Sequence, residues 1–339
     1  MQWFREACVK LEIDGRIAVT DANAAAPALS DADLAAVVPP IADERYPEAM
    51  AGLCERWGVD LAISLNDYEL STWTGAMDSV FASLGVRVLG VRPRAQRVVE
   101  DKFLYSSFFQ THGLDVPRTW LGSEVVSQDP RAETGEDAFV IKNRFGSGSA
   151  GLRRTTRTRL RADVISSART ATNRDGTAPR DGENALELIV VQPLVLGREY
   201  GVDVINDFEG NFAGALAREK LRMRSGETDQ AVSVPSSGFQ EAAARLSSAI
   251  GHTGLVDVDV ILDQEGRQWL IDVNPRFGGG YPFSHLAGAD VPACYLAWHL
   301  GRTVNPDWIR CTPGVTSAKT EAIRTVLARA DWDFRAGAV

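Results

Sequence analysis

The sequence lacks the features that mark membrane, secreted or nucleic-acid-binding proteins. It has no run of about 18 apolar residues, so no transmembrane helix is expected. The first residues, MQWFREACVKLEIDG, carry charges where a signal peptide needs an apolar segment. No Lys/Arg-rich run is present, and the net charge of -9 with a pI near 5.1 disfavours a nucleic-acid surface. Neither a membrane nor nucleic acid is therefore expected as a partner.

The cysteines have no spacing typical of a zinc or redox site. Cys8, Cys54, Cys294 and Cys311 are interpreted as ordinary reduced thiols, which is typical of a cytoplasmic protein. No solenoid-type repeat is present. The chain does have 339 residues, of which 45% are hydrophobic, and this is enough for two or three lobes.

The first hundred residues alternate between helical and strand patterns. Helices are expected at 3–11, 46–58 and 71–85, and strands at 15–23, 59–67 and 86–90. This alternation predicts an α/β domain with a parallel sheet. The pattern enters at a helix, so the strand and glycine turn that usually open such a sheet are not seen.

The rest of the chain predicts longer strands with few helices. A helix runs from 92 to Gly113, and short strands at 119–122, 138–145 and 185–195 are separated by polar segments at 127–137 and 170–184. The remaining elements expected are strands at 199–207 and 211–223, a helix at 239–251, a hairpin at 255–276, a helix at 291–301, and a strand with a tail from 314.

The hairpin gathers acidic side chains on one face. Asp272 and Asn274 have equal parity, so they point the same way. A tight turn at 263–266 is expected to pair Asp257 with Asp272, with Asp259 on the same face. Carboxylates so placed repel one another and raise each other's pKa unless a cation neutralises them.

Hard oxygen donors of this kind suit magnesium rather than zinc. The alternative is a solvated hairpin face with ordinary acidic residues. That alternative leaves Asn274, Pro275 and Arg276 unexplained, so we expect a metal that holds phosphates.

A second segment, FVIKNRFGSGSAG at 139–151, offers groups that bind phosphate. Its strand delivers Lys142, and backbone N–H groups of the loop Gly146, Ser147, Gly148 and Ser149 can approach phosphate oxygens. The lysine precedes the glycines, so this is not a P-loop. Taken alone, the segment is better interpreted as a flexible hairpin tip.

Together these pieces resemble the ATP-grasp superfamily, in particular stand-alone proteins built like one half of a carbamoyl-phosphate synthase large subunit. The likeness covers about 95–300 and follows the order of the family's motifs: EDKFLYSSFFQTHGLDVP, FVIKNRFGSGSAG, VVQPLVLGREYGVDV and DVDVILDQEGRQWLIDVNPR. It implies an α/β fold of two α+β lobes that clasp ATP, preceded by a short Rossmann-like domain. The implied domains are 1–95, 96–195 (small lobe with a glycine-rich lid) and 196–339 (large lobe with the metal hairpin).

The resemblance also assigns roles to individual residues. It places ATP on Lys102, Lys142, Gly146, Ser147, Gly148, Ser149, Gln192, Pro193, Leu194, Glu199 and Lys220. It places the metal on Asp259, Asp272 and Asn274, and catalysis on Arg276, Lys142 and His285.

Two residues depart from the family's pattern. Asp272 stands where most members have Glu and reaches about one bond less, which puts a second magnesium ion in doubt. Pro193 stands in the hinge where many have Glu, and proline has no N–H. Adenine contacts must then come from the N–H of Leu194 and from carbonyls.

The activity implied is that of an ATP-dependent carboxylate–amine ligase, which forms an acylphosphate and then an amide or peptide bond. The cofactors implied are ATP and Mg²⁺, with Mn²⁺ as a substitute, and the substrates are a small carboxylate and an amine, with amino acids favoured. A homodimer is compatible with the sequence. Two alternatives are a carbamoyl-phosphate-synthase-like enzyme that makes an acylphosphate without an amine acceptor, and a nucleotide-binding relative without catalysis.

Several further side chains have two interpretations each. The N–H groups of 278–280 could face the acylphosphate, and His285 is either a substrate ligand or base, or a scaffold residue. Residues 67–69 (Asp-Tyr-Glu) either recognise an amino group or cap a helix. Arg218 and Arg222 either meet a substrate carboxylate or pair with neighbouring glutamates.

Overall fold

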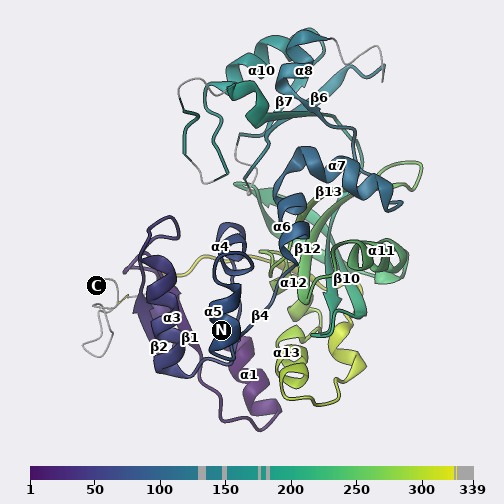
Figure 1. The fold of residues 1–339 in the computed structure, drawn as a ribbon. Coiled ribbons are helices and arrows are strands. Elements are labelled where there is room, and N and C mark those ends of the chain that lie inside the picture. The colour runs from purple at the N-terminus through teal and green to yellow at the C-terminus, as the bar shows by residue number, and fades with distance from the viewer. Residues whose placement is uncertain (129–134, 147–150, 175–176, 181–183, 324–325, 327–339) are drawn as a thin grey trace.

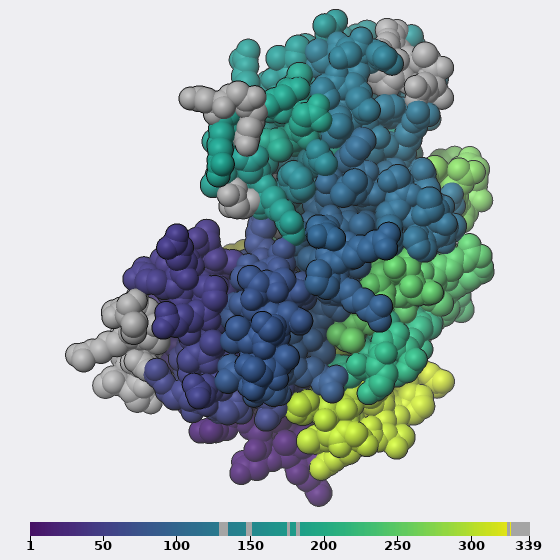
Figure 2. Space-filling view, viewed as in Figure 1, coloured from purple at the N-terminus to yellow at the C-terminus, as the bar shows by residue number. Residues whose placement is uncertain are grey.

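A computed structural model of the chain describes residues 1–339 except 129–134, 147–150, 175–176, 181–183, 324–325 and 327–339. Figure 1 shows three parts: a leading α/β domain at the lower left, a small lobe at the top, and a large lobe at the lower right. The surface is indented between the leading domain and the small lobe (Figure 2). No helix in the described part of the chain combines the length and the hydrophobicity needed to span a bilayer.

The leading domain has the predicted α/β alternation, but its strands form two separate parallel pairs, β1–β2 and β3–β4. The helix expected at 71–85 is divided into two, and the strand β2 was not predicted. The elements are α1 (Gln2–Lys10), β1 (Ala18–Asp21), α2 (Pro27–Ser30), β2 (Leu34–Val37), α3 (Tyr46–Trp57), β3 (Leu61–Ala62), α4 (Asp67–Trp73), α5 (Asp78–Ser83) and β4 (Arg87–Val88).

The first helix belongs to the large lobe by its contacts. Phe4 on α1 packs edge-on against Tyr295 of α13 (Val291–His299), with ring centroids 6.4 Å apart, and Lys10 pairs with Asp290 at the start of that helix. The helix α1 therefore covers α13 of the large lobe.

The long helix expected after residue 92 is two helices, α6 (Pro93–Glu100) and α7 (Lys102–Thr111). Asp101 breaks it, because its backbone is extended and its carboxylate accepts hydrogen bonds from the N–H groups of Phe103 and Leu104. Arg144 pairs with the same carboxylate at 2.8 Å. Lys102 thereby becomes the first residue of α7.

The small lobe is a four-stranded antiparallel sheet in the order β5-β8-β6-β7. Its core packs α8 and α10 against one face, through Val125, Val164, Phe139 and Ile141. The strand β7 was not predicted. The elements are β5 (Trp120–Leu121), α8 (Gly122–Ser127), β6 (Ala138–Asn143), β7 (Arg153–Thr156), α10 (Leu160–Ala168), a 3₁₀ turn (Ala185–Leu188) and β8 (Ile189–Pro193).

The large lobe is a six-stranded antiparallel sheet in the order β13-β12-β9-β10-β11-β14. One face packs against α11 and also against α6 and α7, which the predicted division counts with the small lobe. The other face packs against α13 and the segment around α12. The elements are β9 (Arg198–Asn206), β10 (Phe212–Arg224), β11 (Glu227–Val234), α11 (Gln240–Ile250), β12 (Gly254–Leu262), β13 (Gln268–Asn274), α12 (Tyr281–Leu286), α13, β14 (Thr316–Ala318), and 3₁₀ turns at Ser236–Gly238 and Pro306–Ile309.

The hairpin β12–β13 has a different register from the expected one. Asp259 lies opposite Asp272, and Asp257 lies opposite Asn274. The strands are already one position off the expected pairing next to the turn, and a bulge between Asp259 and Val260 shifts them by one more. The expected pairing of Asp257 with Asp272 is therefore wrong. The prediction that these side chains share one face is confirmed, since cross-strand partners point the same way.

Candidate functional site

Two carboxylates face each other across the hairpin at the centre of the candidate site. Asp259 and Asp272 are direct cross-strand partners, a placement in which like charges repel. Burial raises the pKa of Asp259 to about 6, and this rise is opposed by the ammonium of Lys220. The pair is thus held in a position that calls for positive charge.

Lysines from three different elements supply that charge. Lys220 on β10 donates to Asp259 at 2.7 Å and to Glu199 at 2.9 Å. Lys102 on α7 lies 3.6 Å from Asp272. Lys142 on β6 makes no hydrogen bond or ion pair with the described residues, and burial lowers its pKa to about 8. The ammonium groups therefore meet where polyphosphate oxygens would be held.

The donor set fits a hard divalent cation. Asp259, Asp272 and Asn274 offer two carboxylates and an amide oxygen on one face, and magnesium prefers such oxygens. The described residues contain no cluster of three His, Cys, Asp or Glu side chains arranged for a metal. The proposed donors are consistent with this, because they comprise only two carboxylates and the third donor is the amide of Asn274.

The glycine-bearing loop begins beside Lys102. The carbonyl of Gly146 accepts a hydrogen bond from Lys102 Nζ at 2.6 Å, and the φ of Gly146 is +118°, which favours glycine. Ser147, Gly148 and Ser149 lie outside the described residues. Their role in phosphate binding stays a prediction.

The hinge leaves fewer groups for adenine than expected. Gln192 is buried, and its side-chain amide donates to Thr119 Oγ1 at 2.9 Å. The N–H of Leu194 already donates to the carbonyl of Ala138 at 2.9 Å, and Pro193 has no N–H to offer. The expectation that the Leu194 amide is available does not hold in this structure, because β8 and β6 use it in the sheet.

Arg276 lies between the hairpin β12–β13 and the leading domain. Its Nη2 donates to Asp67 Oδ2 at 2.7 Å and to Asn274 Oδ1 at 3.4 Å, and its Nη1 donates to the carbonyl of Phe277 at 3.1 Å. Its buried Nε has no hydrogen-bond partner among the described residues. The guanidinium is thus fixed beside the predicted metal ligands with donor capacity left for a ligand.

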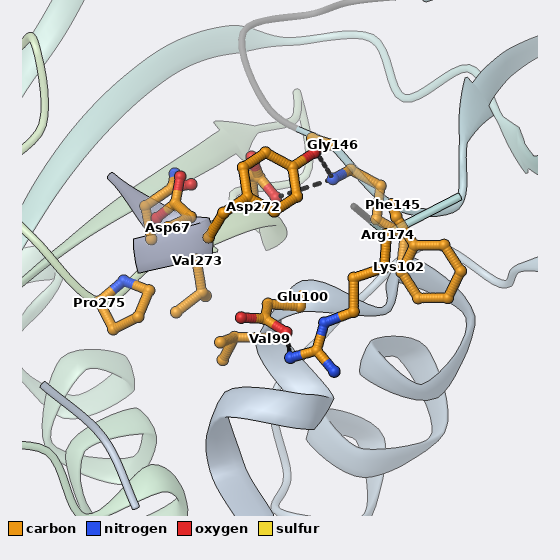
Figure 3. Close-up of a pocket in the computed structure, with 12 residues that line it drawn as sticks. Asp67, Val99, Glu100, Lys102, Phe145, Gly146, Arg174, Asp272, Val273 and Pro275 are labelled. Atoms are coloured by element: carbon orange, nitrogen blue, oxygen red, sulfur yellow. Dashed lines mark hydrogen bonds and ion pairs between the residues drawn. The ribbon is translucent and has the colours of Figure 1, made fainter. Parts of the chain in front are cut away.

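A cavity lies beside these groups; Lys102, Gly146, Asp272 and Asn274 line it, whereas Asp259, Lys142, Lys220 and Arg276 do not. It holds about 420 Å³, including its open mouth, and lies where the leading domain, α6, the small lobe and the hairpin meet. Figure 3 shows Lys102 with its ammonium directed at Asp272 and at the carbonyl of Gly146. The lining residues are Asp67, Tyr68, Val99, Glu100, Lys102, Phe145, Gly146, Arg174, Asp272, Val273, Asn274 and Pro275.

Comparison with known families matches two parts of the chain. Residues 185–323 match the family described as ATP-grasp in the biosynthetic pathway with Ter operon, and residues 1–89 match the PylC-like, N-terminal domain. The chain contains an ATP-grasp domain. The first match contains the hairpin β12–β13 together with Glu199, Lys220 and Arg276.

Curated relatives of this ATP-grasp chain include carbamoyl phosphate synthase large chains. That of Thermotoga petrophila is 23% identical over 224 residues, which is 60% of this chain and 19% of the relative, and that of Thermotoga neapolitana is 22% identical over 233 residues, which is 62% of this chain and 20% of the relative. The chain therefore spans about a fifth of the length of these relatives.

Solved structures with the same fold include biotin carboxylases. A Campylobacter jejuni biotin carboxylase has a TM-score of 0.71 at 17% identity, covering 91% of this chain and 71% of that one. The biotin carboxylase domain of a Hydrogenobacter thermophilus 2-oxoglutarate carboxylase, described with MgADP and bicarbonate, has a TM-score of 0.68 at 16% identity and covers 89% and 67%. These likenesses confirm the ATP-grasp fold.

His285 is not among the residues that line the cavity described above. Its ring stacks on Trp3 of α1 with centroids 4.2 Å apart, and its Nδ1 lies 3.1 Å from the hydroxyl of Tyr281. Burial lowers its pKa. These contacts favour the alternative of a scaffold residue that joins α12 to α1 over the catalytic prediction.

The structure adds residues that the sequence interpretation missed or left open. Asp67 binds Arg276, whereas Glu69 turns away to accept from Tyr46 and Ser64, and Asn66 is the residue that caps α4. Glu100 and Arg174 were not predicted at all. Glu100 is the first residue of the segment EDKFLYSSFFQTHGLDVP, so its place beside Lys102 could have suggested a role in the site. Arg174 lies in a polar segment without a recognisable pattern.

Arg218 belongs to a buried ionic cluster on the same face of the sheet, next to the hairpin. It donates to Asp203 at 2.6 Å and to Asp257 at 2.7 Å, and Ser284 donates to Asp203 at 2.7 Å. Its partners are therefore aspartates and not the neighbouring glutamates of the second interpretation, and Arg222 likewise pairs with Asp229. The cluster pairs Asp257 with a cation, although Asp257 lies opposite the predicted metal ligand Asn274.

This cluster explains two of the three glycines after Arg276. A Cβ at Gly278 would lie 2.0 Å from Asp257 Oδ2, and one at Gly280 would lie 2.1 Å from Arg218 Nη2. A Cβ at Gly279 would lie no closer than 3.5 Å to any atom outside its chain neighbours. Gly278 and Gly280 are thus required for packing, whatever their N–H groups bind.

We expect Gly280→Ala to lower the free energy of unfolding by about 3 kcal/mol, because the methyl group must displace the buried Arg218 from its carboxylates. Chemical denaturation monitored by tryptophan fluorescence measures the change. Gly279→Ala is the matched control and is expected to change stability by less than about 1 kcal/mol. Equal losses in the two variants would contradict the packing explanation.

Proposed function

We propose that this chain is an ATP-dependent carboxylate–amine ligase that joins amino acids through an acylphosphate and releases ADP and phosphate. The observation that carries the proposal is the opposed pair Asp259 and Asp272, met by Lys102 and Lys220 and placed beside Arg276. Phosphoryl transfer needs positioned cations around a polyphosphate rather than covalent chemistry by the protein. The arrangement supplies them.

Magnesium is the metal proposed, held by Asp259, Asp272 and Asn274. A bound magnesium ion would neutralise negative charge on the phosphate oxygens. In the structure the same carboxylates are neutralised by Lys220 and Lys102. We therefore expect these lysines to exchange their carboxylate partners for phosphate oxygens when the nucleotide and the cation bind together.

The first chemical step forms the acylphosphate. A carboxylate oxygen of the substrate attacks the γ-phosphorus of ATP, the bond from that phosphorus to the β,γ-bridging oxygen breaks, and ADP leaves. Lys102 and Lys142 hold the phosphates, and the guanidinium of Arg276 faces the phosphoryl group in transfer. Its place beside Asn274 and Asp67 orients it for that task.

The second step forms the amide. The nitrogen of the amine attacks the acyl carbon, the bond from that carbon to the phosphate oxygen breaks, and inorganic phosphate leaves while the nitrogen loses a proton. Water must be kept from the acylphosphate during this step, since hydrolysis competes.

A second candidate is an acylphosphate-forming enzyme without an amine acceptor. The similarity to carbamoyl phosphate synthase large chains favours it. The two candidates differ in product, because only a ligase gives a stable amide. Use of Mn²⁺, a homodimer like the dimer described for the Hydrogenobacter domain, and a cytoplasmic location also stay predictions.

Hydroxylamine tests the proposed function without knowledge of the natural amine. When the chain is given MgATP, about 200 mM hydroxylamine and one proteinogenic amino acid at a time, we expect a hydroxamate with at least one of them, since hydroxylamine traps acylphosphates. Hydroxamate is measured by mass spectrometry. Reactions without ATP are the control, and absence of hydroxamate from every amino acid would contradict an amino-acid-activating ligase.

A further inference from the structure

Asp67 presents an unsatisfied carboxylate oxygen at the cavity. Its Oδ2 accepts from Arg276 at 2.7 Å, but its Oδ1 is buried and has no hydrogen-bond partner among the described residues. Leaving such a buried acceptor unpaired is destabilising. Because Asp67 lines the cavity, a donor on a bound molecule is the natural partner for this oxygen.

A cation lies one helical turn away along the same helix. Arg174 reaches from the small lobe to Ser71 on α4, where its Nη2 donates to Oγ at 2.5 Å, and it also pairs with Glu100 on α6. Asp67 and Ser71 are i and i+4 on α4, a spacing that places Cβ atoms roughly 5–6 Å apart. Both contacts use Nη2, whereas a guanidinium has five N–H donors in all.

These two residues are separate from the groups assigned to ATP and the metal. Lys102, Asp272 and Asn274 line the same cavity, and Figure 3 shows the Glu100–Arg174 pair lying apart from Asp272. Arg174 also lies outside both parts of the chain that match known families. The cavity therefore has a phosphate side and a second side, where Asp67 has one carboxylate oxygen without a hydrogen-bond partner among the described residues and Arg174 carries a positive charge beside Glu100.

We infer that Asp67 and Arg174 bind the amine substrate as an amino acid, with the ammonium on Asp67 Oδ1 and the carboxylate on Arg174. The inference rests on the proposed function. The distance to be spanned runs from Asp67 to the guanidinium of Arg174, which is held at Ser71 one helical turn away. The ammonium and the carboxylate of one amino acid can span it, with one hydrogen bond to the protein at each end. Since the other oxygen of Asp67 holds Arg276, the amine is held next to the guanidinium that faces the phosphoryl group.

The test uses the full chain with the carboxylate that gives the most hydroxamate, and with the proteinogenic amino acids and their decarboxylated amines as acceptors. We expect Asp67→Asn to raise the KM for the acceptor at least ten-fold more than the KM for MgATP. We expect Arg174→Gln to reduce at least ten-fold the preference for an amino acid over its decarboxylated amine, measured as a ratio of kcat/KM. Asp78→Asn, an exposed change in the same domain, is the control and should do neither.

Each other outcome overturns a specific statement. If Asp67 only positions Arg276, Asp67→Asn lowers kcat and leaves the KM for the acceptor unchanged, which overturns the inference. If wild type forms hydroxamate but joins no amino acid, or if Arg174→Gln affects amino acids and amines equally, the inference fails while the proposed function stands. If wild type forms no hydroxamate, the proposed function fails and the inference falls with it.

Discussion

Asp272→Asn is expected to reduce turnover by a hundred-fold or more while the protein stays folded. The change removes one of the two carboxylates that would hold magnesium, and a metal supplies several kcal/mol of charge stabilisation in phosphoryl transfer. Folding should not suffer, because Asp272 lies opposite Asp259 and the substitution relieves repulsion between them. ADP release measures turnover, and thermal unfolding measures stability.

The matched control is Glu265→Gln, which also neutralises one carboxylate of the same hairpin but at its exposed turn. It should retain the turnover of the wild type. If Asp272→Asn retained it as well, the assignment of the metal to this face of the hairpin would be wrong. Raising the magnesium concentration should restore part of the lost activity, because one carboxylate and Asn274 remain.

Arg276→Ala is expected to lower kcat by roughly a hundred- to a thousand-fold, with a much smaller change in ATP affinity. A charge contact made mainly in the transition state is worth about 3–4 kcal/mol. Arg276 is held by Asp67 and by Asn274, one of the predicted metal ligands, and this position supports a role in the transfer step. Calorimetry for ATP and ADP release for kcat, on one preparation, separate binding from catalysis.

Two further variants sharpen this result. Arg276→Lys should recover only part of the activity, because an ammonium cannot span two oxygens as a guanidinium does. Arg267→Ala removes an arginine at the other end of the hairpin and should be neutral. Collapse of ATP affinity in Arg276→Ala with unchanged kcat at saturation would make Arg276 a ground-state binder.

The shared face of Asp272 and Asn274 could be predicted because it depends only on parity within one strand. Asp259 joins that face through the bulge, which leaves Ile271 as an extra residue and so brings Asp259 opposite Asp272. Asp257 obeyed the same parity, yet it is taken by Arg218 from another strand. Parity fixes direction, whereas the partner depends on residues distant in sequence.

The contacts between domains could not be predicted for the same reason. Asp67 meets Arg276 across 209 positions of sequence, and Arg174 meets Ser71 across 103. His285 seemed a candidate base because histidine often is one, but Trp3 at the other end of the chain covers it. Such contacts arise only when the lobes and the leading domain pack together.

The central claim is that a carboxylate is activated by transfer of phosphate from ATP. The most direct test is to supply the accepted amino acid with ¹⁸O in its carboxylate and to analyse the inorganic phosphate by mass spectrometry. The proposed mechanism predicts that each phosphate released with an amide carries one ¹⁸O, because the carboxylate oxygen that attacks phosphorus leaves with it. Amide formation with unlabelled phosphate would contradict the acylphosphate and, with it, the proposed function.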